Sequence, residues 1–312
     1  MPVNSTSRRQ FLKQISTAGA LAALPFHSSS LFAAHHNEKL YKLSLAQWSL
    51  HRAFRSGKED PLDFARISKE KFGITAIEYV NQFFFDTLND KLVKELHTRA
   101  QGEGVKSLLI MCDREGALGD PDKKVRAKAV SNHHRWANAA HVLGCHSIRV
   151  NAQSSGSWDD QMKYAADGLN QLADYCKKLN LNVIVENHGG LSSNGAWLSG
   201  VMKLADNPRV GTLPDFGNFV INKETGEEYD KYKGVEELMP FAKAVSAKTF
   251  RFDDKGNEPD IDFYRIMKTV VDAGYNGYVG VEYEGDGLDE VTGIKKTIAL
   301  LEKVHSTLKQ NA

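Results

Sequence analysis

Short apolar runs alternate along the chain with longer stretches whose apolar residues recur at helical spacing. A short β-branched or apolar run predicts a buried strand, and the longer period predicts an amphipathic helix. The predicted strands cover residues 43–50, 76–80, 106–112, 146–152, 182–187, 210–215, 244–252 and 278–284. One predicted helix opens at Asp60–Pro61, and the others cover residues 86–101, 122–143, 158–179, 197–205, 234–242, 262–273 and 288–305.

Strands separated by helices of this length are expected to run parallel, because each crossover is long enough to return the chain. Eight such units predict the α/β class and closure into a single (β/α)8 TIM barrel over residues 40–308. An open doubly wound sheet is the alternative. No GxGxxG follows the first strand and no GxxxxGK[ST] occurs, so the sequence does not support a nucleotide-binding version of that sheet.

The N-terminal 34 residues have a different pattern. Arg8 and Arg9 lie in the segment SRRQFLK, an apolar stretch follows over residues 15–26, and the small residues Ala33 and Ala34 come after it. This order predicts a twin-arginine signal peptide over residues 1–34 and a periplasmic protein. The apolar stretch is too short to span a bilayer, so we expect no stable membrane insertion after cleavage. An uncleaved anchor and a disordered basic N-terminus are the alternatives.

Charge and cysteine content narrow the class of function. The chain has 40 Lys and Arg against 39 Asp and Glu. Removing residues 1–34 would remove Arg8, Arg9 and Lys13 but no Asp or Glu. The remaining chain would be slightly acidic, so we expect no nucleic-acid partner. Its three cysteines, Cys112, Cys145 and Cys176, form no CxxC pair. Their odd number argues against a disulfide framework, and we expect them to be buried as small apolar residues.

Acidic residues end three of the predicted strands. Glu186, Asp215 and Glu282 each follow apolar residues closely. Because chemistry in a (β/α)8 barrel gathers at the C-terminal strand ends, we expect these carboxylates to converge. Close, buried carboxylates repel one another and have raised pKa values, and a divalent metal ion would offset both effects. The alternative is a carboxylate–lysine network that uses Lys248.

Four segments then carry a family resemblance: VIVENHGG (183–190), LPDFGN (213–218), VSAK (245–248) and VEYEG (281–285). They resemble the sugar phosphate isomerase/epimerase family, within the xylose isomerase-like TIM barrels of the AP endonuclease family 2 superfamily. The resemblance implies a metal ion (Mn, Mg, Co or Zn) held by Glu186, Asp215 and Glu282. The family's strand-seven histidine is replaced here by Ser246. Water or His188 would complete the coordination, or metal binding would be weak.

The resemblance also implies catalytic and substrate-binding roles. Glu186 and Glu282 would remove and return a proton beside a carbonyl, while the metal stabilises an enediolate. Lys248 would stabilise the developing oxyanion, or form a structural salt bridge. The candidates for substrate binding are His188, Asn218, Arg149, Asn151, Glu78 and Trp48. For the last four, hydrogen bonding and packing at the strand ends is an alternative role.

The resemblance therefore implies a metal-dependent isomerase or epimerase, or a related lyase or hydratase. Its partner would be a small-molecule sugar or keto-sugar, and export favours a non-phosphorylated one because sugar phosphates are mainly cytosolic. Two other classes stay open. A non-catalytic sugar-binding barrel is motivated by Ser246. A phosphodiesterase of the endonuclease IV type would need a three-zinc cluster with many histidine ligands, which the strand ends lack. Both a monomer and a homo-oligomer remain open.

Overall fold

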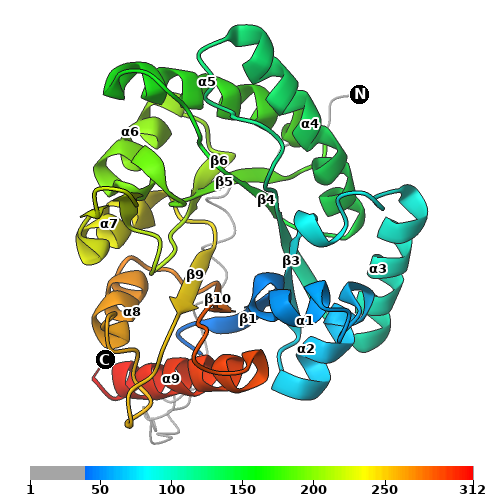
Figure 1. The fold of residues 1–312 in the computed structure, drawn as a ribbon, viewed down its shortest axis with the longest axis vertical. Helices are drawn as coiled ribbons and strands as arrows, with labels where there is room; N and C mark the ends of the chain where they lie inside the picture. Colours follow the sequence, from blue (N-terminus) through cyan, green and yellow to red (C-terminus); the bar gives the residue numbers. More distant parts are fainter. Residues whose placement is uncertain (1–38, 312) are drawn as a thin grey trace, which may run out of the picture. The chain divides into compact units, whose positions relative to one another are not determined.

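Eight parallel strands form the central sheet, and the longer helices lie around its outside (Figure 1). This computed structural model describes residues 39–311. The strands are β1 (Lys42–Ala46), β2 (Ala76–Val80), β3 (Lys106–Met111), β4 (Ser147–Val150), β5 (Asn182–Glu186), β6 (Val210–Leu213), β9 (Val245–Thr249) and β10 (Tyr278–Tyr283). Their order in the sheet is β6-β5-β4-β3-β2-β1-β10-β9. The prediction of eight parallel strands is confirmed. The predicted signal peptide, with its paired arginines, lies outside the described residues.

The two edge strands, β6 and β9, are linked through neighbouring residues by two isolated backbone bridges. Thr212 bridges Ala242, and Asp215 bridges Ser246. The Ser246 amide donates to the Pro214 carbonyl at 2.9 Å, and the Phe216 amide donates to the Ser246 carbonyl at 3.1 Å. These bonds place Asp215, just beyond β6, directly beside Ser246 in β9.

Most of the helices begin where a polar side chain caps the first turn. Asp60, which precedes Pro61, accepts a hydrogen bond from the Leu62 amide in a short 3-10 helix. Asp122 accepts hydrogen bonds from amides in the first turn of α4. Such caps satisfy amides that have no partner within the helix. The helices are α1 (His51–Arg55), α2 (Phe64–Phe72), α3 (Asp90–Glu103), α4 (Lys123–Val142), α5 (Trp158–Lys177), α6 (Gly195–Ala205), α7 (Lys231–Leu238), α8 (Phe263–Asp272) and α9 (Glu290–Gln310). Across residues 39–311, none of them has the length and apolar character needed to cross a membrane.

Among the local differences from the predicted elements, two have a clear physical reason. The first strand ends at Ala46 instead of continuing to Leu50, because Gln47–Leu50 forms a 3-10 turn. The Gln47 side chain accepts a hydrogen bond from the Val80 amide at 2.8 Å, which replaces a strand-to-strand bond. The second difference is a small antiparallel hairpin, β7 (Val220–Asn222) with β8 (Glu227–Glu228), that was not predicted. Strands of this length are too short to show an alternating pattern.

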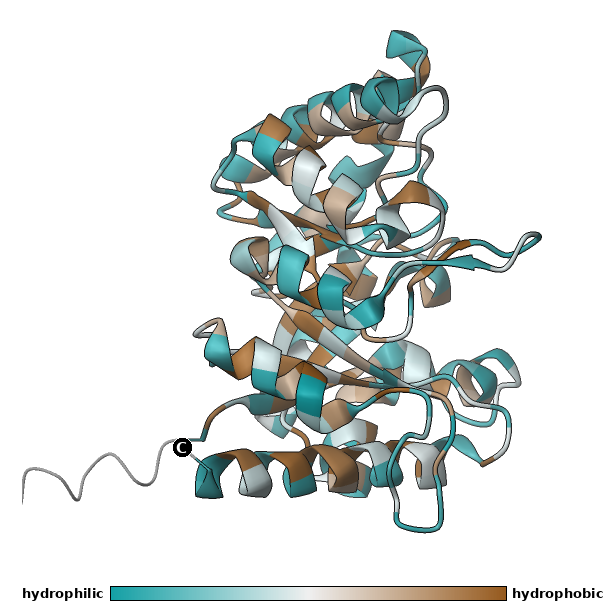
Figure 2. Cartoon of the chain, turned by 90° about the vertical axis from the view of Figure 1, so that its left-hand side faces the viewer, coloured by the Kyte–Doolittle hydropathy of each residue, from teal (hydrophilic) through white to brown (hydrophobic). Residues whose placement is uncertain are grey.

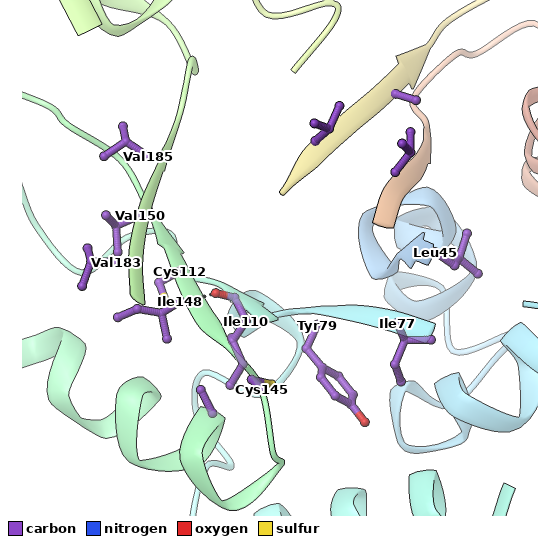
Figure 3. Packing of buried hydrophobic residues seen from close by; sticks show 14 of the residues in the cluster. Leu45, Ile77, Tyr79, Ile110, Cys112, Cys145, Ile148, Val150, Val183 and Val185 are labelled. Atoms are coloured by element: carbon purple, nitrogen blue, oxygen red, sulfur yellow. Dashed lines mark hydrogen bonds between the residues drawn. The ribbon is translucent and has the colours of Figure 1, made fainter. Parts of the chain in front are cut away.

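Side chains alternate between the two faces of each strand. Those on one face pack against the helices in the larger hydrophobic core, which includes Ile77, Tyr79, Ile110 and Val183 (Figure 3). The strands are largely apolar, while the helices alternate between apolar and polar residues, as amphipathic helices do (Figure 2). The other face carries a smaller apolar cluster: Ala46, Val80, Leu109, Met111, Ile184, Leu213 and Ala244. The three cysteines are free and buried, as predicted.

Candidate functional site

Three buried carboxylates meet at the C-terminal ends of the strands. Glu186 ends β5, Asp215 lies two residues past β6, and Glu282 belongs to β10. One oxygen from each lies within 4.8 Å of the others. Glu186 and Asp215 lie on the same face as the smaller apolar cluster, because Glu186 follows Ile184 by two residues and Asp215 follows Leu213 by two. At most 4 % of any of the three residues is exposed.

The loop after β6 holds Asp215 in place. The Asp215 amide donates to Asn187 Oδ1 at 2.7 Å. Beyond β6, this backbone amide is therefore bonded to a side chain. The amides of Gly217 and Asn218 donate to Asp215 Oδ1 at 2.8 and 2.9 Å. Gly217 leaves no room for a side chain, since a Cβ there would lie 2.7 Å from the Phe250 ring. One Asp215 oxygen is thus fixed by the backbone, and the other faces the cluster.

Ser246 occupies the space between two of the carboxylates. Its Oγ lies 2.7 Å from Asp215 Oδ2 and 2.8 Å from Glu282 Oε2. A serine hydroxyl carries one proton and donates one hydrogen bond. The second short oxygen–oxygen contact therefore requires either a proton on a carboxyl group or a cation that neutralises the pair.

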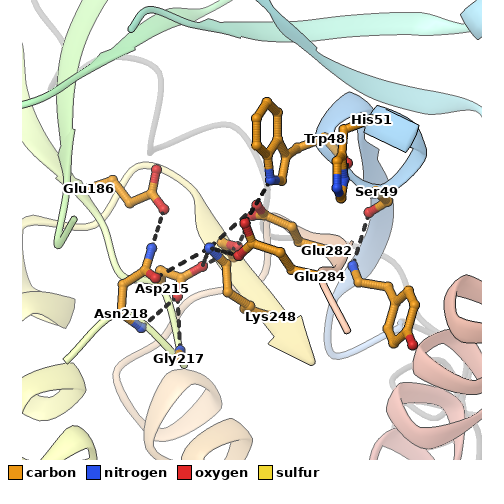
Figure 4. Close-up of polar contacts among 12 residues, drawn as sticks. Trp48, Ser49, His51, Glu186, Asp215, Gly217, Asn218, Lys248, Glu282 and Glu284 are labelled. Atoms are coloured by element: carbon orange, nitrogen blue, oxygen red, sulfur yellow. Dashed lines mark hydrogen bonds and ion pairs between the residues drawn. The ribbon is translucent and has the colours of Figure 1, made fainter. Parts of the chain in front are cut away.

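Two buried cations, Lys248 and Arg149, contact the acidic cluster, and Figure 4 shows Lys248 among the acids. Lys248 Nζ lies 3.0 Å from Glu284 Oε2, 3.5 Å from Glu282 Oε1 and 3.8 Å from Asp215 Oδ2. Arg149 Nε lies 2.7 Å from Glu186 Oε2. That contact is an ion pair without hydrogen-bond geometry, since neither atom has a hydrogen-bond partner. Lys248 is most closely paired with Glu284, and Arg149 is shared with a further acid.

That further acid is Asp113, whose Oδ1 lies 2.7 Å from Arg149 NH1. Among residues 39–311, the Lys and Arg side chains that form ion pairs with the five acids of the site are Lys248 and Arg149, and the acids are Asp113, Glu186, Asp215, Glu282 and Glu284. Burial raises the pKa of Asp215 and of Glu282; Lys248 opposes the rise, and Glu186 adds to it. Burial lowers the pKa of Lys248, but the surrounding acids outweigh it and raise that pKa well above its usual range.

The donor set fits a divalent metal ion. Three carboxylates converge, the negative charge exceeds the positive charge, and Glu186 Oε2 is buried without a hydrogen-bond partner. Hard cations are held in proteins by oxygen ligands of this kind. The structure therefore brings together the three residues predicted as metal ligands.

A cavity of about 560 Å³ opens beside the cluster. Glu282 and Lys248 line it, whereas Glu186 and Asp215 are not among its lining residues. Five of the six residues predicted to bind substrate also line it: His188, Asn218, Arg149, Asn151 and Trp48. A substrate in this cavity would therefore meet Glu282 and Lys248 directly.

Hydrogen bonds fix most of these lining side chains. Asn218 Nδ2 donates to Glu186 Oε1 at 2.9 Å, and Asn151 Nδ2 donates to Asp113 Oδ1 at 2.9 Å. The Trp48 indole donates to Glu284 Oε1 at 2.8 Å (Figure 4). His188 differs because it is exposed.

Glu78 is the one predicted substrate-binding residue that does not line this cavity. It lies in the middle of β2, where Oε1 accepts a hydrogen bond from Ser44 Oγ at 2.6 Å. It lines a different cavity, together with Asn182 and Tyr278 at the N-terminal ends of β5 and β10. Burial raises the pKa of Glu78 to about 7. The prediction treated Glu78 like a strand-end residue, but its side chain reaches the opposite end of the strands.

Two acids of the site were not among the predicted site residues. Asp113 follows β3 and is held by Arg149, Asn151 and Gln82, whose Nε2 donates to Asp113 Oδ2 at 3.0 Å. Glu284 follows β10 and joins Trp48 to Lys248. Both carry the signal that identified the other acids, namely a carboxylate directly after an apolar strand.

The parallel strands, the surrounding helices and the strand-end acids define an α/β barrel with a candidate metal centre. The chain belongs to the xylose isomerase-like TIM barrel family, whose family model matches residues 68–304. The family resemblance seen in the sequence is thereby confirmed.

Relatives of known name share shorter segments or the fold. The C-glycoside deglycosidase alpha subunit of Arthrobacter globiformis is 36 % identical over 74 residues, 24 % of this chain and 21 % of that protein. Inosose dehydratase of Clostridium perfringens is 29 % identical over 148 residues, 41 % of this chain and 49 % of that protein. Each of these two matches spans less than half the length of the relative. The structure of the 3-keto-D-glucoside 4-epimerase from E. coli superposes with a TM-score of 0.62 at 18 % identity, over 78 % of this chain and 95 % of that one.

Proposed function

We propose that this protein is a metal-dependent isomerase or epimerase, or a related lyase, that acts on a non-phosphorylated keto-sugar. The observation that carries the proposal is the convergence of Glu186, Asp215 and Glu282 within 4.8 Å beside a polar cavity. The three carboxylates would hold the ion. When bound, a divalent cation supplies a Lewis acid that polarises a carbonyl and stabilises charge on its oxygen.

The arrangement of the side chains suggests how the proton moves. Glu282 lines the cavity, so we assign it the removal of a proton from the carbon beside the carbonyl. Lys248, 3.5 Å from Glu282, stabilises negative charge that develops on a substrate oxygen. Glu186 is held by Arg149 and Asn218 and is the candidate to return a proton.

The names of the relatives support a keto-sugar or an oxidised glycoside as substrate. One is a 3-keto-D-glucoside epimerase, another a deglycosidase subunit and a third a dehydratase. Removal of a proton beside a carbonyl serves all three reaction types. If the next carbon carries a leaving group, the electron pair of the broken C–H bond forms a C=C bond, and the group departs with its own electron pair and takes up a proton.

The test is deuterium exchange in D2O with ketoses, keto-sugars and a keto-glycoside, with and without EDTA. We expect exchange beside the carbonyl, its loss with EDTA and in Glu282→Gln, and its retention in the matched surface variant Glu302→Gln on α9. Absence of exchange and of aglycone release across the whole panel would rule the proposal out.

A second candidate function is sugar binding without catalysis. It is favoured by the contacts of Lys248 and Arg149, which already neutralise part of the acidic cluster. It requires saturable sugar binding with no turnover, and binding that persists in Glu282→Gln. Calorimetry on the same sugar panel separates it from the enzyme, because an enzyme must also show exchange.

We also propose that residues 1–34 direct export by the twin-arginine route and that residues 40–308 form the exported domain. The proposal rests on the paired arginines and the short apolar stretch after them. Cell fractionation tests it: the protein should be periplasmic, and Arg8→Lys with Arg9→Lys should leave it in the cytoplasm. Export of the double variant at the normal level would contradict this role.

A further inference from the structure

We propose that the N-terminal end of the barrel, opposite the carboxylate cluster, binds a small molecule that carries two or more negative charges from phosphoryl or carboxylate groups. The inference goes beyond the proposed function and does not depend on it. Its basis is a group of basic side chains around a cavity of about 430 Å³. This basic group consists of Lys42, Lys106, His146, Arg209 and Lys243.

Each member of the basic group lies at the start of a strand. Lys42 and Lys106 are the first residues of β1 and β3, and His146 and Arg209 directly precede β4 and β6. Lys243 lies two residues before β9. Because the strands are parallel, their first residues lie at the same end of the sheet. Five of the eight strands therefore bring a basic side chain to this end.

A tyrosine ring and the cavity wall bring four of these side chains together. The ammonium groups of Lys42 and Lys106 each lie 5.7 Å from the centre of the Tyr278 ring. His146, Lys243 and Tyr278 line the cavity. Burial lowers the pKa of His146, and the positive charges of Lys106 and Lys243 lower it further.

The basic group has no acidic partners within residues 39–311, where neither its lysines nor Arg209 forms an ion pair with a carboxylate. Arg209 donates instead to the Leu181 carbonyl at 3.3 Å and to Asn180 Oδ1 at 3.4 Å. Burial lowers the pKa of Lys243, and Arg209 lowers it further. Like charges gathered without counterions repel one another. A bound anion would offset this repulsion and accept hydrogen bonds from charged donors, which are the stronger kind.

The cavity is suited to a small polar ligand. Its volume of about 430 Å³ is within the range of small-molecule sites. Asn182 and Asn276 line it beside the basic residues and offer amide donors. Tyr275 also lines it, but its hydroxyl already donates to the Tyr278 carbonyl at 2.6 Å.

Glu78 lines the same cavity, and its environment limits its negative charge. The residue is 1 % exposed, and within the described structure its Oε2 atom has no hydrogen-bond partner. Burial raises the pKa of Glu78 to about 7, so near neutral pH much of it carries a proton. A protonated carboxyl group can donate a hydrogen bond to an anion.

Isothermal titration calorimetry with two probes tests the site on the full protein as isolated. Inorganic phosphate represents the phosphoryl source, and benzene-1,3,5-tricarboxylate represents the carboxylate source. Sodium chloride at equal ionic strength controls for screening of surface charge. We expect at least one probe to bind near one molecule per chain and to raise the melting temperature above its value in sodium chloride. The probe with the lower Kd identifies the source of the negative charge.

Two variants locate the bound anion. Lys106→Gln and Lys243→Gln each remove one cation from the basic group, and each should weaken binding about tenfold, the size expected for one hydrogen bond to a charged group. The matched control is Lys128→Gln, which removes the same charge from an exposed position of α4 and should keep the wild-type affinity. Circular dichroism identifies any variant that fails to fold. The exposed Lys106 keeps the test available if Lys243→Gln does not fold.

A purely structural role of the lysines predicts a different result. Without a probe, Lys106→Gln should melt no lower than the wild type, because the substitution relieves repulsion within the basic group. A lower melting temperature with unchanged probe affinity would show a structural role and contradict the proposal.

The proposal is overturned if neither probe binds beyond the effect of sodium chloride, or if folded Lys106→Gln and Lys243→Gln keep the wild-type affinity. Equal weakening in Lys128→Gln would also overturn it, because the probes would then respond to overall charge. None of these measurements involves turnover, so their outcome is separate from that of the proposed function.

Discussion

Arg149 Nε lies 2.7 Å from Glu186 Oε2, so β4 supplies a buried cation to the carboxylate at the end of β5. The same guanidinium reaches Asp113 at 2.7 Å through NH1. The Arg149 side chain thus offsets the negative charge of two acids. Glu186 belongs to the candidate metal centre, and Asp113 lines the cavity. Stability and function are coupled at this residue.

Arg149→Met should destabilise the fold strongly. It leaves Glu186 and Asp113 buried without their cation, and breaking a buried ion pair costs about 3–5 kcal/mol. Urea unfolding followed by circular dichroism measures the loss. The matched control is Arg251→Met, whose ion pair with Asp260 is largely exposed and should contribute little. Equal effects of the two substitutions would contradict the assigned role of Arg149.

Lys248→Met should lower kcat far more than it changes KM. The ammonium lies 3.5 Å from Glu282 and lines the cavity, so its contribution belongs mainly to the charged transition state. Removing one such electrostatic donor typically costs about 10²–10³ in kcat. Steady-state kinetics on the substrate found by deuterium exchange measures this, with the exposed Lys233→Met as control. A rise in KM at constant kcat would show a binding role only.

Removal of the metal should lower thermal stability, and a hard cation should restore it. An ion that binds only the folded state adds about 2.7 kcal/mol at a hundred times its Kd. The melting temperature of chelated protein should therefore rise as Mn²⁺ or Mg²⁺ is added. Glu186→Gln and Asp215→Asn each lose a ligand and should show a smaller rise and a lower metal content. A rise in either variant equal to that of the wild type would exclude its residue as a ligand.

Glu78 should make stability depend on pH. Burial raises its pKa from 4.5 to about 7, so the folded state keeps a proton that the unfolded chain releases. The free energy of unfolding therefore falls as pH rises through this window and levels off above about 7. Glu78→Gln removes the free-energy cost of ionising a buried carboxyl group, and the glutamine amide oxygen can still accept the hydrogen bond from Ser44. Its gain over the wild type should grow from pH 5 to pH 8, to at most roughly 3 kcal/mol.

Thermal unfolding of the wild type and of Glu78→Gln between pH 5 and pH 8 measures the free energy of unfolding of each. The difference between them isolates Glu78, because the other titrating groups are shared. A difference that is the same at pH 5 and pH 8 would show that Glu78 does not titrate in this window.

The sequence alone was enough to predict the order of the eight sheet strands with the helices between them, and three of the five acids at the strand ends. Hydrophobic periodicity is local information, and the apolar runs before Glu186 and Glu282 are visible without any partner strand. Strand ends were predicted less well. Gln47 leaves the strand pattern because its side chain bonds the Val80 amide, a contact between distant parts of the chain.

Only the tertiary structure decided which polar groups meet. Sheet register places Ser246 between Asp215 and Glu282, and joins Arg149 to Glu186 and Asp113. It also directs Glu78 away from the cavity that the other candidates line. The physical reason is that strand alternation fixes the face on which a side chain lies, whereas its depth and partners depend on how neighbouring strands are staggered. That stagger comes from long-range pairing, so single segments of the sequence do not contain it.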